Sequence, residues 1–215
     1  MAKLTVTIDS ENPYVKVESI HSGITAVKSV TVDEFCTSMA QNVHIGGFQS
    51  GILPPGCISL TANRDSVQFL LLCGFNRCDI TYHDTVYRNF PLPCLVVGAK
   101  MDSSGRLSGF RLGVIANELP APNTQMYHYP FSNVSEDGGL CVGSNTFHGY
   151  DSLWKLRTLP HRLLSIPNND DQYSEKNSQL NLPYRALLEH LKDKDTSYYY
   201  EKVLIPNGKT LKDFI

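Results

Sequence analysis

Alternating apolar and polar residues recur along the first half of the chain and predict short β-strands. Turn-forming residues separate these runs, among them Pro54-Pro55-Gly56 and Asp102-Ser-Ser-Gly105. Residues 126–131 form a further extended segment that follows a proline-rich stretch. The predicted strands cover residues 3–8, 14–18, 57–62, 66–73, 79–87, 92–97 and 107–116.

Helical periodicity is clear in two places. Thr31-Val-Asp-Glu34 has the spacing of a capping box and is followed by apolar residues on one face, so a helix is predicted over residues 32–42. Leu182–Lys192 spaces its apolar residues for one buried face and predicts a second helix. Two shorter helical stretches are expected after Asp151 and at Pro160.

Strands dominate the first part of the chain and helices the last, which is typical of an α+β protein. Residues 202–211 are expected to form a hairpin through Asn207-Gly208. A chain of 215 residues is long enough for one elaborated domain or two small ones. We expect a β-rich N-terminal region over residues 1–90 and a core over residues 91–215 that includes the C-terminal helix and hairpin.

Charge and composition exclude several classes of function. The chain has 19 Lys and Arg against 21 Asp and Glu, a net charge of −2, so it lacks a basic footprint for nucleic acid or an anionic membrane. No apolar run approaches the ~20 residues that span a bilayer. The first residues lack the apolar segment and cleavage site of a signal peptide, so a cytoplasmic protein is expected.

Six cysteines without an export signal are expected to be reduced thiols rather than disulfides. Metal-binding spacings are missing as well: there is no Cys-x-x-Cys and no His-x-x-x-His, and Cys73-x4-Cys78 lacks a second ligand pair. Cys57, Cys73 and Cys94 lie among aliphatic residues, where cysteine behaves as a small buried hydrophobe. Neither a metal nor another cofactor is expected.

A thiol and an amide lie in one segment, where Asn133 precedes Cys141 by eight residues across a polar, glycine-containing turn. An Asn in a turn ordinarily only tolerates left-handed backbone, but its amide also suits an oxyanion, a role worth ~3 kcal/mol. A cysteine after Gly-Gly-Leu is ordinarily buried, whereas the polar residues 135–139 favour exposure of this one. Asn133 and Cys141 together suffice to form, hold and pass on a thioester.

Two carboxylates and two histidines are further candidates. Asp170 and Asp171 belong to a polar loop that is ordinarily only solvated, but a carboxylate folded over Cys141 would orient and help to deprotonate an incoming amine. His128 and His148 flank Cys141 in the sequence, and either would serve as the base of a Cys–His hydrolase. The residues alone leave both kinds of chemistry open.

Taken in order, these residues resemble the active-site region of ubiquitin-conjugating enzymes. In that family two meander strands and a proline segment lead into a His-Pro-Asn turn, with the catalytic Cys eight residues after the Asn. A Trp and an acidic loop that faces the Cys follow. The matching elements here are the strands at residues 92–97 and 107–116, the prolines at 120 and 122, Asn133, Cys141, Trp154 and the loop Ser165–Asp171.

The match is closer to the prokaryotic branch of the family, which includes protein B of bacterial PRTRC systems. It rests on Leu92-Pro-Cys-Leu-Val, then Tyr127-x-x-Pro-Phe-x-Asn-Val, then Gly-x-x-Cys-Val-Gly. This chain departs from the family in three ways, the first being that the N-terminal helix that docks the activating enzyme in that family is not evident. Phe131-Ser132 stands in place of His-Pro, and the longer stretch between Cys and Trp indicates an inserted loop over residues 143–152.

The resemblance implies an α+β fold with a ubiquitin-conjugating-enzyme-like antiparallel meander sheet flanked by helices. It implies that Cys141 accepts a ubiquitin-like protein as a thioester, that Asn133 stabilises the oxyanion, and that Asp171 positions the attacking amine or hydroxyl. The implied partners are a ubiquitin-activating-like adenylating enzyme, a ubiquitin-like protein and a metallopeptidase of the same operon. No cofactor is implied, because the activating enzyme supplies the energy of ATP.

Two other functions compete with this expectation. One is a catalytically inactive protein of the same fold that only binds a ubiquitin-like partner. The presence of both Cys141 and Asn133 argues against it. The other is the Cys–His hydrolase that would use His128 or His148.

Overall fold

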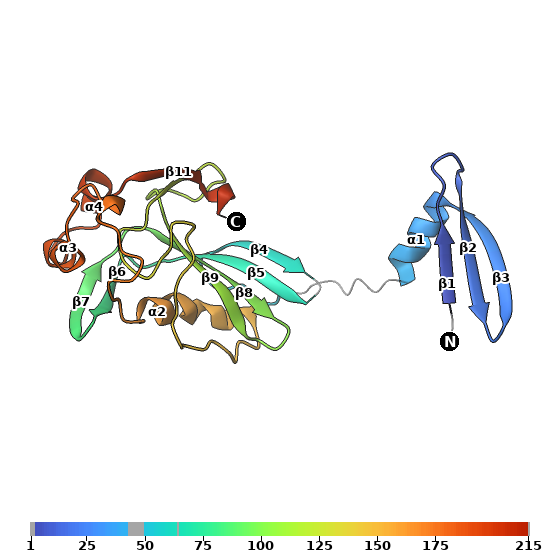
Figure 1. The fold of residues 1–215 in the computed structure, drawn as a ribbon, viewed down its shortest axis with the longest axis horizontal. Coiled ribbons are helices and arrows are strands. Elements are labelled where there is room, and N and C mark those ends of the chain that lie inside the picture. Colours follow the sequence, from blue (N-terminus) through green and yellow to red (C-terminus); the bar gives the residue numbers. More distant parts are fainter. Residues whose placement is uncertain (1–2, 43–49, 64, 215) are drawn as a thin grey trace. The chain divides into compact units, whose positions relative to one another are not determined.

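The computed structural model describes residues 3–42, 50–63 and 65–214 (Figure 1). The chain divides into two compact units, Met1–Gln49 and Ser50–Ile215. This division differs from the predicted one at residues 90 and 91. The reason is that β5 (Ser66–Leu72) and β8 (Leu95–Asp102), which lie on either side of the predicted boundary, pair along the whole of β5 in one sheet.

The unit Met1–Gln49 contains a three-stranded antiparallel sheet in the order β1-β2-β3, followed by one helix. The third strand was not predicted, and it closes on the second through a tight turn at Ser22-Gly23, where both residues have positive φ. The elements are β1 (Lys3–Thr7), β2 (Tyr14–His21), β3 (Ile24–Thr31) and α1 (Val32–Asn42).

The capping box predicted before α1 is confirmed. The backbone N–H of Thr31 donates to Glu34 Oε2 at 3.0 Å, and the backbone N–H of Glu34 donates to Thr31 Oγ1 at 3.2 Å. These two bonds satisfy donors that the first turn of a helix leaves free. The helix packs against β2 and β3, and Val15 on β2 is fully buried.

The unit Ser50–Ile215 is built on a six-stranded antiparallel sheet in the order β11-β10-β9-β8-β5-β4. Antiparallel strands accompanied by helices confirm the α+β class. In Figure 1 the strands β4, β5, β8 and β9 lie side by side, with α2 beside them. The strands not yet given are β4 (Cys57–Asn63), β9 (Leu107–Ile115), β10 (Gln125–Tyr127) and β11 (Pro206–Thr210).

Both faces of this sheet carry buried residues, and successive side chains of a strand point to opposite faces. On β8, Leu95 and Val97 join the main core, while Val96 joins a smaller cluster on the other face. The main core is closed by leucines and tyrosines of the later helices. These helices are η1 (Leu153–Thr158), α2 (Leu159–Leu164), α3 (Tyr184–Leu191) and α4 (Ser197–Lys202). The short helix η2 (Glu175–Asn177) has no buried residue.

Two segments differ from the strand prediction. Residues 79–87 are not one strand but parts of a hairpin, β6 (Arg77–Tyr82) and β7 (Thr85–Pro91), which turns at His83-Asp84. Residues 202–211 are not a hairpin either. Their strand β11 pairs with β10, and Asn207-Gly208 lies where the register shifts. A partner strand was available in the fold, so the Asn-Gly pair forms an irregularity in a ladder instead of a turn.

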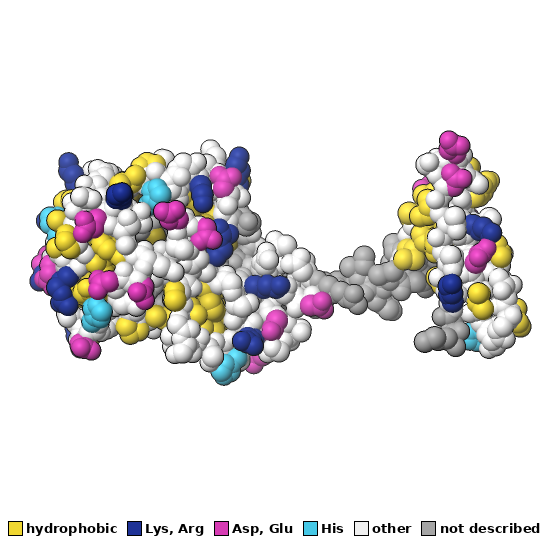
Figure 2. Space-filling view, in the orientation of Figure 1, with side chains coloured by type: hydrophobic (Ala, Val, Ile, Leu, Met, Phe, Trp, Pro, Cys, Tyr) yellow, Lys and Arg dark blue, Asp and Glu magenta, His cyan; other side chains and the backbone are white. Residues whose placement is uncertain are grey.

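Lys and Arg side chains are interspersed with Asp and Glu over the visible face of the unit Ser50–Ile215 (Figure 2). This agrees with the small net charge of the chain, −2. None of the described helices is long and apolar enough to cross a membrane.

Candidate active site

A short turn brings Cys141 back to Asn133. The chain reverses over residues 135–139, and Val134 and Leu140 form an antiparallel bridge on either side of that turn. The next pair outward is joined directly, because the backbone N–H of Cys141 donates to the carbonyl oxygen of Asn133 at 2.8 Å. The eight-residue spacing seen in the sequence therefore places the two residues opposite each other.

The side chain of Cys141 is exposed, as the polar character of its neighbours indicated. Beyond it the chain continues as a loop to Ser152, which agrees with the predicted loop over residues 143–152. Gly143 has a φ of 56°, and a side chain at this position would meet no atom within 4 Å. The thiol thus lies on an open surface that another macromolecule can approach.

Asn133 links this turn to a second loop. Its backbone N–H donates to the carbonyl oxygen of Asp171 at 3.0 Å, and its side-chain Nδ2 donates to the carbonyl oxygen of Pro167 at 3.1 Å. The residue is 8% exposed and has a φ of 64°, a left-handed conformation that Asn tolerates. An amide nitrogen carries two hydrogens, so the bond to Pro167 leaves one further donor.

The two residues that precede Asn133, Phe131 and Ser132, are buried beneath the turn. Phe131 lies edge-on to Phe90, with ring centroids 5.9 Å apart, and is 3% exposed. Ser132 Oγ donates to Asn168 Oδ1 at 3.2 Å. The turn is thus held by an aromatic anchor and a hydroxyl, and both contacts lie beside Asn133.

Asp171 reaches the site through its backbone. Its carbonyl oxygen accepts from Asn133, and its own N–H donates to Asn169 Oδ1 at 2.8 Å. The carboxylate accepts from Asn169 Nδ2 at 2.9 Å, and the residue is exposed. The structure therefore brings together all three predicted site residues, Cys141, Asn133 and Asp171, around the backbone of Asn133.

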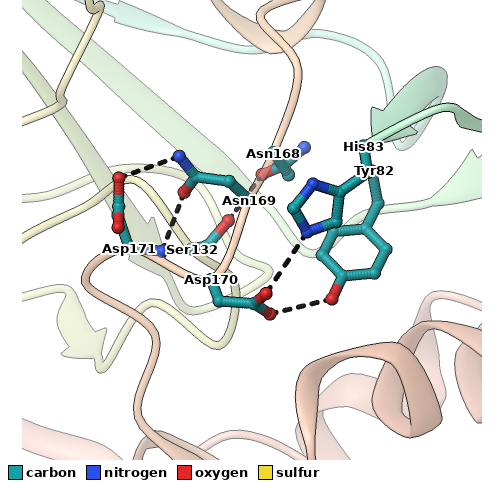
Figure 3. A network of polar contacts seen from close by, with 7 residues as sticks. All are labelled: Tyr82, His83, Ser132, Asn168, Asn169, Asp170 and Asp171. Carbon is teal, nitrogen blue, oxygen red and sulfur yellow. Dashed lines mark hydrogen bonds and ion pairs between the residues drawn. The ribbon is translucent and has the colours of Figure 1, made fainter.

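Asp170 plays a different part, which the sequence did not indicate. Tyr82 OH donates to Asp170 Oδ1 at 2.8 Å, and His83 Nε2 lies 3.2 Å from Asp170 Oδ2. In Figure 3, Asp170 points towards Tyr82 and His83, while Asp171 lies on the other side, beside Asn169. The hydrogen bond from Tyr82, and then the one from His83, hold the pKa of Asp170 below its usual value.

The same loop is fastened to the β6–β7 hairpin by its backbone. The N–H of Asn168 donates to the carbonyl oxygen of Thr81 at 2.7 Å, and the N–H of His83 donates to the carbonyl oxygen of Asn168 at 3.0 Å. Tyr82 and Asn168 consequently form a short parallel bridge. The sequence prediction ran one strand through His83-Asp84, and nothing local indicated the contact of this turn with residue 168.

The two histidines proposed as bases are not bonded to the thiol. His148 is exposed, and His128 is half-buried with its backbone N–H donating to the carbonyl oxygen of Ile205 at 2.9 Å. Across residues 3–42, 50–63 and 65–214, no hydrogen bond joins a histidine ring to Cys141, and no group of three or more metal-binding side chains gathers. Trp154 is 41% exposed, and the guanidinium of Arg157 lies 4.8 Å from its ring centroid.

No family model, no curated protein and no solved structure matches the chain.

Proposed function

We propose that this chain is a ubiquitin-conjugating-like transferase of a bacterial conjugation system. Cys141 accepts the C-terminal carboxyl group of a ubiquitin-like protein as a thioester from an adenylating enzyme and passes it to an amine or hydroxyl. One observation carries the proposal. An exposed cysteine, an asparagine amide and an acidic loop converge on the backbone of Asn133, through bonds of 2.8 Å to Cys141 and 3.0 Å to Asp171.

The first step is a thioester exchange. Cys141 Sγ attacks the carbonyl carbon of the thioester carried by the activating enzyme. A new C–S bond forms as the old one breaks, and the thiol proton of Cys141 passes to the departing sulfur. The exposure of Cys141 and the open backbone at Gly143 suit this step, because two protein surfaces must approach closely.

The second step transfers the acyl group to the acceptor. The nitrogen or oxygen of the acceptor attacks the Cys141 thioester, the C–S bond breaks, and the proton lost by the acceptor is taken up by the sulfur. Negative charge develops on the carbonyl oxygen, where the remaining amide hydrogen of Asn133 would stabilise it. The exposed carboxylate of Asp171 would orient the acceptor.

The competing functions are less well supported. A Cys–His hydrolase needs a histidine within hydrogen-bond reach of the thiol, and no such bond exists in the described part of the chain. A protein that only binds a ubiquitin-like partner does not require an exposed thiol opposite an asparagine. Transfer by Cys141 uses both features.

The decisive experiment replaces the sulfur by oxygen. The chain is incubated with ATP, an adenylating enzyme and the ubiquitin-like protein that this enzyme activates. Wild type is expected to form an adduct that dithiothreitol releases, because thiols cleave thioesters. Cys141→Ser is expected to form an adduct that resists dithiothreitol, because an oxyester forms instead.

Cys36→Ser is the matched control, because Cys36 is also exposed but lies in the unit Met1–Gln49. It should behave as wild type does. If wild type forms no thiol-labile adduct, or if the adduct forms equally on Cys141→Ala, the transferase function is refuted.

A further inference from the structure

The segment Pro206–Phe214, here named the strap, follows the last helix and lies along the edge of the sheet. Its strand β11 pairs with β10, and a 3-10 turn, η3 (Leu211–Asp213), follows. A capping box between Thr210 and Asp213 holds this turn, with the N–H of Thr210 donating to Asp213 Oδ2 at 2.8 Å. The strap therefore has an ordered structure of its own.

Two apolar side chains anchor the strap to the second face of the sheet. Leu211 and Phe214 are 3% and 6% exposed and pack with Val96, Ile115 and Met126. The backbone adds a further bond, because the N–H of Leu211 donates to the carbonyl oxygen of Thr124 at 2.9 Å. The strap is thus held against the sheet by its side chains and by its backbone.

The ring of Phe214 also lies against the turn that precedes Cys141. A Cβ atom added to Gly138 would lie 2.7 Å from Phe214 Cε2, closer than real Cβ atoms come to other atoms. Gly138 has a φ of 87°, which other residues rarely adopt. A glycine is therefore required here both by the backbone conformation and by the ring that packs on it.

Arg111 on β9 joins the strap to the same turn. Its Nη1 donates to the carbonyl oxygen of Phe214 at 2.5 Å, and its Nη2 donates to the carbonyl oxygen of Asp137 at 3.3 Å. The guanidinium carbon also lies 4.1 Å from the centroid of the Phe214 ring, in cation–π geometry. One side chain thus bonds to both segments.

These contacts lead directly to the thiol. The carbonyl oxygen of Gly138 accepts from the N–H of Leu112 at 2.9 Å, and the N–H of Leu140 donates to the carbonyl oxygen of Phe110 at 2.9 Å. The next residue is Cys141, whose N–H bonds to Asn133. A two-stranded hairpin this short is not stable by itself, so its geometry depends on what packs against it.

We propose that Phe214 and Arg111 are positioning residues: the strap holds the 135–140 turn so that Cys141 stays opposite Asn133. The catalytic consequence rests on the proposed transferase function, whereas the mechanical link does not. A strap that moved would let the turn open and would separate the thioester carbonyl from the amide that stabilises its oxyanion. The strap therefore belongs to the site through the turn that it holds, and not through a contact with the acyl group.

The first test measures the turn directly. Phe214→Leu replaces the ring that contacts Gly138 by a smaller aliphatic side chain and so keeps an apolar anchor. Amide hydrogen exchange is expected to rise at least about tenfold at Leu140 and Cys141, with little change in the central strand β8. Phe69→Leu is the matched control, because Phe69 is an equally buried ring in the main core of the sheet and should not loosen the turn.

A double-mutant cycle tests the contact itself. Gly138→Ala should also raise exchange at Cys141, since its Cβ would displace the ring. In a chain that already carries Phe214→Leu, Gly138→Ala should raise exchange at Cys141 by a smaller factor than it does in wild type, because the ring is no longer there to be displaced. Additive effects, or equal exchange in Phe214→Leu and Phe69→Leu, would overturn the inference.

The second test measures transfer. The thioester is formed first, and its discharge to a free amine is followed in a single turnover over a range of amine concentrations. Phe214→Leu and Arg111→Ala are expected to lower the maximal rate about tenfold or more, without changing the amine concentration that gives half of it. A purely structural role would lower the amount of folded protein but not this rate.

The two proposals fail separately. If wild type forms no thioester, the transferase function is refuted, while hydrogen exchange still decides whether the strap holds the turn. If wild type charges and discharges normally but Phe214→Leu discharges at the wild-type rate, the positioning role is refuted and the transferase function stands.

Discussion

Asn133 combines a structural and a chemical role in one side chain. Its amide donates to the carbonyl oxygen of Pro167, and its backbone joins Cys141 on one side and Asp171 on the other. Any replacement of this residue therefore changes the geometry of the site as well as its chemistry. The choice of substitution decides which of the two roles an experiment measures.

Asn133→Gly separates the roles best, because glycine adopts the φ of 64° without strain. It removes the amide but keeps the backbone bonds. We expect thioester formation on Cys141 to persist and transfer to an amine to fall by about 10²–10³-fold, the usual loss when one oxyanion donor is removed. Single-turnover discharge of the preformed thioester measures this effect.

Asn89→Gly is a suitable control, because Asn89 also has a positive φ, 49°, but lies within β7. It should leave both steps unchanged. Equal losses in thioester formation and in transfer for Asn133→Gly would show that the residue only holds the fold.

At the level of elements, the loop Ser165–Asp171 connects two parts of the fold. Pro167 and Asp171 accept hydrogen bonds from Asn133. Between them, Asp170 is held by Tyr82 and His83 of the β6–β7 hairpin. The pKa of Asp170 is lowered by these partners. Its contacts therefore stabilise the docked loop above the ordinary pKa of an aspartate and are lost as the pH falls through the lowered pKa.

Tyr82→Phe tests this clasp. The hydrogen bond from Tyr82 is the largest cause of the lowered pKa of Asp170, so its removal should raise that pKa towards the ordinary ~3.9. Carbon-13 NMR of the aspartate side chains during an acid titration measures the change. His83→Ala should raise the same pKa by less, since His83 is the second cause.

Asp102 provides the internal reference in the same spectra. Its pKa is lowered by a hydrogen bond from Ser104 in the turn between β8 and β9, and Tyr82→Phe should not move it. An unchanged titration of Asp170 in Tyr82→Phe would contradict the assigned clasp.

Element prediction from the sequence succeeded where the signal is local. The capping box at Thr31 and Glu34 marked the start of α1, and the apolar face of Leu182–Lys192 marked α3 (Tyr184–Leu191). It failed at β3, where Ile24–Thr31 was not recognised, and at Asn207-Gly208, where a turn signal lies inside a strand. In the latter case pairing with a distant strand overrode the local preference of the dipeptide.

At the scale of the whole molecule, the boundary between the units follows strand pairing rather than composition. β5 lies between β4 and β8, so a cut at residue 90 would remove two strands of the six-stranded sheet. It would also remove the β6–β7 hairpin that clasps the Asp170 loop. The residues before position 90 thus contribute both to the core and to the site.

Two fragments test this division. Residues 50–215 are expected to fold, with a dispersed amide NMR spectrum and one cooperative urea transition, because every strand of the six-stranded sheet is present. Residues 91–215 are expected to show neither, because β8 would lose its partner β5 and the main core would lose Phe69 and Ile80. Cooperative unfolding of the shorter fragment would contradict the observed boundary.

The amino-acid sequence alone determined the features that depend on neighbours along the chain. These include the cap of α1, the apolar face of α3 and the turn that returns Cys141 to Asn133 after eight residues. Local preferences and short spacings are sufficient for them. The candidates Cys141 and Asn133 were found in this way, whereas Asp171 was named from the family resemblance, and its backbone meets that of Asn133 only in the tertiary structure.

Only the tertiary structure decided which distant segments hold this site. Tyr82 meets Asp170 across 88 residues of chain, and Arg111 meets the carbonyl oxygen of Phe214 across 103. No local preference encodes such contacts, because they form only when burial of the two faces of the sheet brings the segments together. That packing positions the loop Ser165–Asp171 and the strap around the turn that carries Cys141.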